Sequence, residues 1–331
     1  MYACFPSSDT LRTALWLAMR APSVHNSQPW RWRIAGQSQS LHLFADPCRH
    51  LPHTDPDRRD LLLSCGASLH HAAVALAALG WHPTVHRFPD PADADHLAAV
   101  KVDRRPASEL DVKLAAAIPR RRTDRRLYSR WPVALADIGL LHARATRAGV
   151  ILRQTDAHHG LQQIVAQAVR WHATDPGYHG ELMAWSGKAG STDGVPARNT
   201  PRCDPTAPLP ARIFADPGLD QPPGATSADD RGIVVALGTT DDSPLAHLRA
   251  GEATSLVLLT ATALGLASCP LTEPLEVGKT RLAVQRDLFG SSAFPQILLR
   301  IGWAPVNADP LPPTPRRPLD EVVNFGTATS A

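Results

Sequence analysis

A short polar run near the N-terminus, APSVHNSQPW, concentrates hydrogen-bonding side chains in one place. Asn26 and Gln28 each offer amide donors and an acceptor, and Ser23 adds a hydroxyl. Pro22 and Pro29 hold the backbone out of a helix on either side. Such a set of groups suits a flat heterocycle with donors and acceptors on its edge. Capping of the neighbouring elements is the alternative, above all for Ser23 or Asn26 taken alone.

An arginine-rich run, IPRRRTDRRLYSRWP, is the second chemical feature, with five arginines among residues 120 to 126. In an extended segment alternate residues share a face, so Arg121, Thr123 and Arg125 would point together. Two guanidinium forks with a hydroxyl between them have the size of a phosphate site. A solvated basic stretch is the alternative, as is a patch that binds nucleic acid.

A second basic pair, Arg316 and Arg317, lies close to the C-terminus in PLPPTPRRPLDEVV. The prolines of this tail favour an extended, pre-ordered chain that can lie across the surface as a strap. Such a strap would deliver an arginine to a site at low entropic cost. The alternative is a terminal arm pinned by salt bridges to Asp320 or Glu321.

Composition limits the possible classes of protein. The chain has 331 residues, of which 44% are hydrophobic and 20% charged, so it is globular and not disordered as a whole. A formal net charge of +3 gives no reason to expect nucleic acid or a membrane as the main partner. The five cysteines are widely spaced and form no CxxC pair. We therefore expect a reducing compartment, no metal site and, without a signal-like N-terminus, a cytoplasmic protein.

Two segments of similar composition organise the chain. GASLHHAAVALAALGW runs from residue 66 to 81, and GEATSLVLLTATALGL from 251 to 266. Each predicts a helix buried on nearly all sides and ended by Gly80 or Gly265. Any two alanine-rich buried helices would look alike, but short strand-like runs flank both of these. We expect an α+β fold of two similar halves fused in one chain, residues 1 to 119 and 120 to 331.

An insertion interrupts the second half between about residues 156 and 230. It begins as a helical pattern, HGLQQIVAQAVRWHA, and continues into a long stretch rich in Pro and Gly. Such a stretch is either a disordered linker or a loop that folds over something. Because it lies inside one half and not between the two, we expect a functional lid.

With these features in order, the sequence resembles the nitroreductase family of FMN flavoproteins. PSVHNSQPW (22 to 30) matches the family's PSxxNxQPW segment, and RRTDR (121 to 125) matches its phosphate segment. GEATSLVLLTATALGLAS matches the family's buried helix, RIGWAP (300 to 305) its late strand, and PRRPLDEVV its tail. The resemblance covers most of the chain apart from the insertion, and it implies a nitroreductase-like fold.

The departures from the family's pattern are also informative. The first half has the PSxxNxQPW segment without a phosphate segment, and the second half has the reverse. In the family, two identical subunits build each FMN site from one element of each subunit. One chain that fuses two such halves would keep one intact site and form a monomer shaped like a dimer. This division resembles the Acg-type subgroup of actinobacterial nitroreductase-like proteins, as does the insertion.

The resemblance implies a flavin ring held mainly by the first half and a phosphate held by the second half and the tail. The loop after the second buried helix falls where the family's loop runs beside the ring. The residues that the resemblance places at FMN are Pro22, Ser23, His25, Asn26, Gln28, Arg121, Arg122, Thr123, Arg125, Cys269, Pro270, Leu271, Thr272, Arg316 and Arg317.

Two functions follow from the resemblance. The first is an oxidoreductase in which FMN takes a hydride from NAD(P)H and passes electrons to an acceptor such as a nitroaromatic or a quinone. The flavin carries this chemistry, so no catalytic side chain is expected. The second is a non-catalytic protein that stores or sequesters FMN under a closed lid. The two differ in whether nicotinamide can reach the ring.

Overall fold

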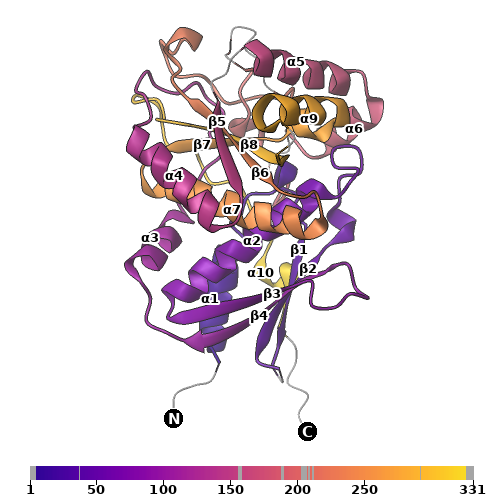
Figure 1. Cartoon of the computed structure of the whole chain (residues 1–331), viewed down its shortest axis with the longest axis vertical. Helices are drawn as coiled ribbons and strands as arrows, with labels where there is room; N and C mark the ends of the chain where they lie inside the picture. Colours follow the sequence, from indigo (N-terminus) through magenta and orange to yellow (C-terminus); the bar gives the residue numbers. More distant parts are fainter. Residues whose placement is uncertain are drawn as a thin grey trace.

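Two β-sheets, each covered by helices, form the fold of the computed structural model (Figure 1). The structure describes residues 5–36, 38–155, 159–187, 190–202, 207, 209–210, 212–290 and 292–325. The first sheet has the strand order β3 (Trp81–Arg87), β4 (His96–Arg104), β2 (Ser40–Ala45), β1 (Trp30–Ala35), β9 (Val323–Phe325). Its neighbours are antiparallel except β1 and β9, which are parallel. The C-terminal tail therefore completes the sheet that the N-terminal half begins.

The second sheet is antiparallel throughout. Its strand order is β5 (Ile151–Thr155), β6 (Ile233–Thr239), β8 (Phe294–Gly302), β7 (Ala267–Leu271). Apolar residues of β6 and β8 pack on α7 on one side, and on the other they join a cluster that includes residues of α5. The strands that the sequence predicts on either side of the two alanine-rich segments are thus all present.

Helices cover both sheets and fill the space between them. Those of the first half are α1 (Ser8–Ala18), α2 (Arg59–Ala78) and α3 (Glu109–Ala117). Those of the second half are α4 (Leu135–Arg147), α7 (Pro244–Ala263), α8 (Glu273–Glu276) and α9 (Gly278–Val284), and the tail adds α10 (Leu319–Val322). The insertion contributes α5 (His159–Ala173) and α6 (Pro176–Ala184), which lie at the far end of the second sheet in Figure 1.

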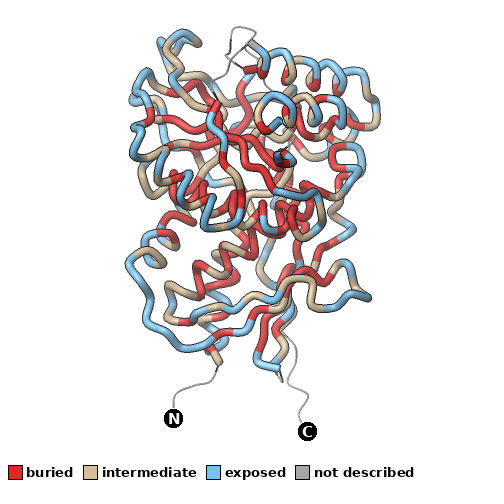
Figure 2. Tube along the Cα trace, in the orientation of Figure 1, coloured by how far each residue is buried: buried red, intermediate tan, exposed pale blue. Residues whose placement is uncertain are grey.

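The two long helices α2 and α7 lie against each other between the sheets, where buried backbone is concentrated (Figure 2). A methyl group at Gly66 would lie 2.1 Å from the carbonyl oxygen of Leu248, and one at Gly251 would lie 2.1 Å from that of Leu63. The helices therefore touch backbone to backbone, which only glycine permits. By length and composition α2 could cross a membrane, but 78% of its apolar window is buried inside the protein.

Polar contacts also join the halves across this helix pair. Arg87 donates two hydrogen bonds to the carboxylate of Glu252, at 2.7 and 2.8 Å. Ser255 Oγ lies 2.8 Å from Nδ1 of the buried His71. Arg59, at the start of α2, donates to the carbonyl oxygen of Pro295 at 2.9 Å. Because buried polar groups cost free energy unless they are paired, these contacts fix how one half sits on the other.

The two alanine-rich helices end as predicted, but the C-terminal tail returns to the sheet of the N-terminal half. Gly80 and Gly265 have φ values of +82° and +86°, the left-handed conformation that ends a helix at glycine. Strand β9 joins the first sheet although it belongs to the end of the chain. The division into residues 1 to 119 and 120 to 331 stays a prediction, and the tail crosses it.

We predict that Gly251→Ala lowers the free energy of unfolding by about 1–3 kcal/mol or more, because the added methyl group meets the Leu63 carbonyl. Gly139→Ala in α4 is the matched control, since a methyl group there has open space. The control should be neutral or stabilising by up to about 1 kcal/mol. Urea unfolding of both variants measures the difference. Equal stabilities would show that α2 and α7 do not depend on this contact.

Candidate functional site

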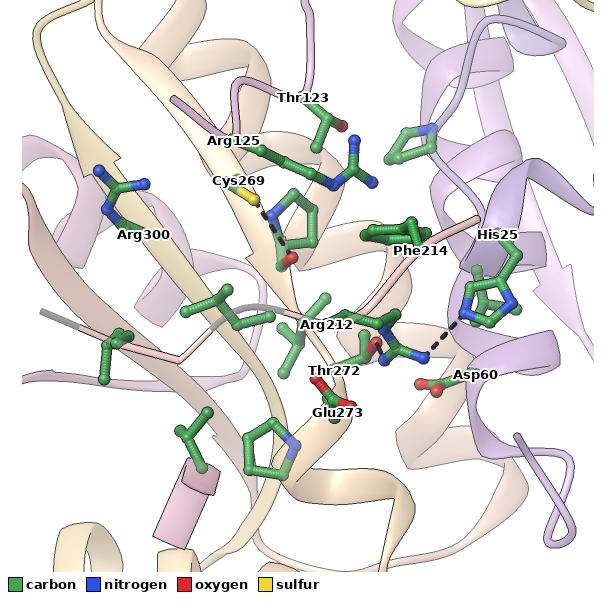
Figure 3. A pocket seen from close by; sticks show the side chains of 18 of the residues that line it. His25, Asp60, Thr123, Arg125, Arg212, Phe214, Cys269, Thr272, Glu273 and Arg300 are labelled. Atoms are coloured by element: carbon green, nitrogen blue, oxygen red, sulfur yellow. Dashed lines mark hydrogen bonds between the residues drawn. The ribbon is translucent and has the colours of Figure 1, made fainter. Parts of the chain in front are cut away.

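A cavity of about 200 Å³ lies where the two halves and the insertion meet. The first half lines it from the polar run and from the start of α2, and the second half from the arginine-rich run, strand β7 and the start of α8. The insertion forms a further wall. The lining residues used below are Pro22, Ser23, His25, Asp60, Thr123, Arg125, Arg212, Phe214, Cys269, Pro270, Leu271, Thr272 and Glu273. Figure 3 labels all of these except Pro22, Ser23, Pro270 and Leu271.

The polar run reaches the cavity through a strained backbone. His25, Asn26 and Gln28 have φ values of +46°, +55° and +52°, in the left-handed region that non-glycine residues rarely adopt. Each such residue costs on the order of 1–3 kcal/mol and persists only where its surroundings hold it. Ser23 Oγ accepts the backbone N–H of Gln28 at 3.0 Å and closes the turn. Strain of this kind is typical of functional sites.

The amide side chains of this run hold other parts of the chain in place. Asn26 Nδ2 donates to the carbonyl oxygen of Gly194 at 3.0 Å and to that of Pro315 at 3.2 Å. Gln28 Nε2 donates to the carbonyl oxygen of Thr192 at 2.9 Å. The predicted ring contacts Asn26 and Gln28 therefore fasten the insertion and the tail, while Pro22, Ser23 and His25 line the cavity.

Next to the cavity lies a group of four arginines, Arg20, Arg121, Arg122 and Arg316, which we call the arginine cluster. Among the described residues none of the four forms an ion pair. Arg121 is 7% exposed. Within the described part of the chain its Nε has no partner, and the hydrogen bond of its side chain runs from Nη1 to Thr123 Oγ1 at 3.4 Å. Burial and the other arginines lower the pKa of Arg121 to about 10. Buried positive charge without a counter-ion indicates an anion site.

Arg316 is a member of the arginine cluster, but its own donors are occupied. Its guanidinium donates to the carbonyl oxygens of Met19, Arg20 and Ala21 at 2.8 to 3.2 Å. The remaining donors go to two carbonyl oxygens of the tail itself. The side chain thus caps the C-terminal end of α1, where cations are favourable. All five donors are used, so the predicted direct phosphate contact from Arg316 has no free donor in this arrangement.

Two further predicted arginines also serve contacts within the chain. Arg122 Nε donates to the carbonyl oxygen of Leu311 at 3.1 Å and so binds the tail. The Arg317 guanidinium lies 3.5 Å from the Glu321 carboxylate and 3.9 Å from that of Asp46. The alternative of a terminal arm pinned by Glu321 therefore describes Arg317. Of the predicted arginines, Arg125 lines the cavity, and Arg121 has a buried Nε without a partner among the described residues.

Arg125 and strand β7 form one wall of the cavity. Arg125 donates to the carbonyl oxygen of Asn199 at 3.1 Å, and its guanidinium carbon lies 5.0 Å from the centroid of the Phe214 ring. Strand β7 holds the arginine-rich run beside it through a bridge between Thr123 and Ser268. Burial raises the pKa of the Cys269 thiol, which is therefore not a ready nucleophile.

Arg212 of the insertion links all three walls, and sequence reasoning missed it. Nη1 donates to His25 Nε2 at 2.9 Å and to the Tyr178 hydroxyl, while Nη2 donates to Thr272 Oγ1 at 3.2 Å and to the Glu276 carboxylate. His25 must be neutral to accept this bond, and burial together with Arg212 lowers its pKa. Because the insertion has no periodic pattern around Arg212, nothing in the sequence singles this residue out.

Asp60, Glu273 and Phe214 are further cavity residues that the sequence did not indicate. Asp60 stands in the first turn of α2, where an acidic residue is explained by the helix dipole. Glu273 accepts a hydrogen bond from His172 Nδ1 at 3.1 Å. Within the described part of the chain, no three His, Cys, Asp or Glu side chains gather in a way that could hold a metal ion.

Comparison with known proteins gives close relatives but no matching family model. The chain is 60% identical over 321 residues to “Putative NAD(P)H nitroreductase Rv3131” of Mycobacterium tuberculosis, covering 97% of this chain and 93% of the relative. It is 37% identical over 329 residues to “Putative NAD(P)H nitroreductase acg” of the same organism, covering 96% of each. A solved structure, the FMN-dependent nitroreductase NfnB from Mycobacterium smegmatis in complex with NADPH, is similar with a TM-score of 0.41 and 16% identity, covering 66% of this chain and 100% of that one.

We predict that Arg212→Ala lowers the free energy of unfolding by about 3–5 kcal/mol, because it removes the arginine that pairs with the buried Glu276 carboxylate. The insertion should also be cut faster in limited proteolysis. Arg198→Ala, an exposed position in the same insertion, is the control and should change neither property. An Arg212→Ala variant that resists protease like the parent would contradict the role of this side chain in fastening the insertion.

Proposed function

Because the chain belongs to the family of NAD(P)H nitroreductases, we propose that it binds FMN between its two halves and reduces a small acceptor, such as a quinone or a nitroaromatic, with NAD(P)H. The observation that carries the proposal is the unpaired arginine cluster beside a cavity to which both halves contribute. Bound FMN supplies the hydride chemistry, and the chain supplies binding, orientation and electrostatics.

The phosphate end of the site is supported by unpaired polar atoms. Among the described residues, buried Arg121 Nε and buried His71 Nε2 have no partner. Burial lowers the pKa of His71, and the charges of Arg121 and Arg316 lower it further. A phosphate group would pair with Arg121 and the Thr123 hydroxyl and would neutralise the arginine cluster. The donor set thus fits the cofactor, with Arg316 contributing charge and holding α1, and not donating directly.

The ring end of the site is supported by the shape and polarity of the cavity. Pro22, Ser23 and His25 face it from one half, and residues 269 to 272 face it from the other. Arg125 places a positive charge between them, which favours a ring that carries partial negative charge. We assign these residues to the ring, and Asn26 and Gln28 to holding the insertion and the tail over it.

Three further points belong to this proposal. Both walls come from one chain, so we propose a monomer shaped like a nitroreductase dimer. Its halves would be residues 1 to 119 and 120 to 331, with the insertion from about 156 to 230 as the lid. We propose a cytoplasmic location, with the quinone or nitroaromatic as a small-molecule partner and neither nucleic acid nor membrane as a partner.

A second function is favoured by one observation, the position of the insertion. Its residues, among them Arg212 and Phe214, line the cavity and are fastened to both halves. A lid that stayed closed would keep nicotinamide from the ring, and the protein would then store or sequester FMN. The binding residues are the same in both functions, which differ only in access to the ring.

We predict that Arg121→Ala weakens FMN binding by about 1.5–3 kcal/mol, or roughly 10- to 150-fold in Kd, because a charge-assisted phosphate contact is lost. The affinity for riboflavin, which has no phosphate, should not change. Arg120→Ala is the control, since this neighbouring side chain is exposed. Calorimetric titration of the protein with each ligand measures the effect. Equal losses for FMN and riboflavin, or no loss for either, would contradict the phosphate assignment.

A further inference from the structure

We propose that Asp60 is a catalytic acid that protonates the acceptor during its reduction in the cavity. The inference rests on the proposed function and adds to it a side chain with a chemical role. It starts from the position of Asp60 at the polar end of the cavity, near His25 and Arg212 (Figure 3). An acid at this point would meet an oxygen-bearing acceptor such as a quinone.

The Asp60 carboxyl is buried, directed to the cavity and unpaired. Asp60 is 6% exposed and lines the cavity wall from the first turn of α2. Its carboxyl oxygens make no hydrogen bond and no ion pair within the described part of the chain. A buried ionised carboxylate without a partner is costly, whereas a neutral carboxylic acid is tolerated and can donate to a ligand.

The charged groups around Asp60 favour its neutral form. Asp55, in the loop before α2, and Glu276, on α8, face it with negative charge, while Arg59 and Arg212 face it with positive charge. Arg59 is engaged with Gln296, and Arg212 with Glu276. Burial, together with the two carboxylates, holds the pKa of Asp60 well above its ordinary value.

The carboxyl group of Asp55 lies near that of Asp60 but has hydrogen-bond donors around it. Its oxygens accept the backbone N–H groups of Asp60 and Leu61 at 3.0 and 2.8 Å, which stabilises the ionised form. Burial still raises the pKa of Asp55 to about 6, so it is mostly ionised at neutral pH. Two neighbouring carboxyls with different environments indicate one ion and one proton donor. Asp60 is the one that holds the proton.

The other titratable groups of the cavity are less suited to this role. His25 Nε2 accepts from Arg212, so the ring is neutral. Its remaining proton, on Nδ1, is buried and has no partner among the described residues. Glu273 is occupied by His172. Burial raises the pKa of the Cys269 thiol, which makes it a weaker acid still. Among the described residues of the cavity wall, Asp60 is thus the acid best placed to give a proton to a ligand.

The proposed step balances for a quinone acceptor. Reduction to the hydroquinone takes two electrons and two protons, and one hydride originating from NAD(P)H brings both electrons and one proton. The second proton passes from the Asp60 carboxyl to a quinone oxygen. The O–H bond of Asp60 breaks, its electron pair stays on the carboxylate, and a new O–H bond forms on the product. Water returns the proton to Asp60 before the next turnover.

The protonation of Asp60 can be tested without cofactor. Infrared spectra of the unliganded protein at neutral pH should contain the carbonyl band of a buried protonated carboxyl group. Asp60→Asn should remove this band, and Asp9→Asn, which changes an exposed first-turn aspartate of α1, should leave it. A spectrum of Asp60→Asn that matches those of the parent and the control would overturn the proposal.

The role of Asp60 in turnover is tested on the FMN-loaded protein by measuring the two half-reactions separately. Asp60→Asn should slow reoxidation by benzoquinone by roughly 100-fold, while reduction by NADPH and the Kd of FMN stay unchanged. In the parent, reoxidation should slow as pH rises through the pKa of Asp60, because only the protonated acid acts, and the variant should lose this dependence. Parent-like reoxidation by Asp60→Asn would overturn the proposal. A parent that fails to bind FMN would instead contradict the proposed function, and the infrared result would still decide whether Asp60 holds a proton.

Discussion

The backbone contact between α2 and α7 is the constraint on which the rest of the structure depends. Gly66 and Gly251 let the two helices approach closely. A side chain at either position would collide with the backbone of the facing helix. The residues of α2 that line the cavity stand within two turns of Gly66, and Thr254 lines it from α7. The polar run packs on α2, and Val24 donates to Ser64 at 3.1 Å. The walls of the site are therefore placed by one helix crossing.

Charge is the second constraint, and it acts against the unliganded fold. Grouping four arginines without a carboxylate is unfavourable, since burial and mutual repulsion lower the pKa values of Arg121 and Arg316. The chain offsets part of this cost with backbone carbonyls, as Arg316 does at the end of α1. The cost that remains is that of the buried charge of Arg121, and an anionic ligand would reduce it. Binding of FMN and stability of the fold are thus linked through the same side chains.

Much of the fold could be predicted from the sequence, because apolar patterning and glycine positions are local signals. Gly80 and Gly265, the two alanine-rich helices and the strands beside them could all be found in this way. The cavity residues Pro22, Ser23 and Thr123 followed from the resemblance. The hydrogen bonds of Asn26, Gln28 and Arg316 could not be predicted, because their partners lie in the insertion, the tail and the end of α1, far along the chain. Arg212 lies in a stretch without a periodic pattern, and Asp60 lies in a first helical turn, where an acidic residue is explained by the helix dipole. Only the folded structure brings them to one cavity.

The most direct test of the account is an anaerobic titration of the FMN-incubated protein with NADPH, followed by visible absorbance. The account predicts one flavin per chain and bleaching of the flavin band within seconds to minutes, since both halves of one chain complete the site and nicotinamide reaches the ring. A band that persists with NADPH and bleaches only with dithionite would contradict the oxidoreductase and favour a closed lid. A protein that carries no flavin band after incubation with FMN would contradict the site itself.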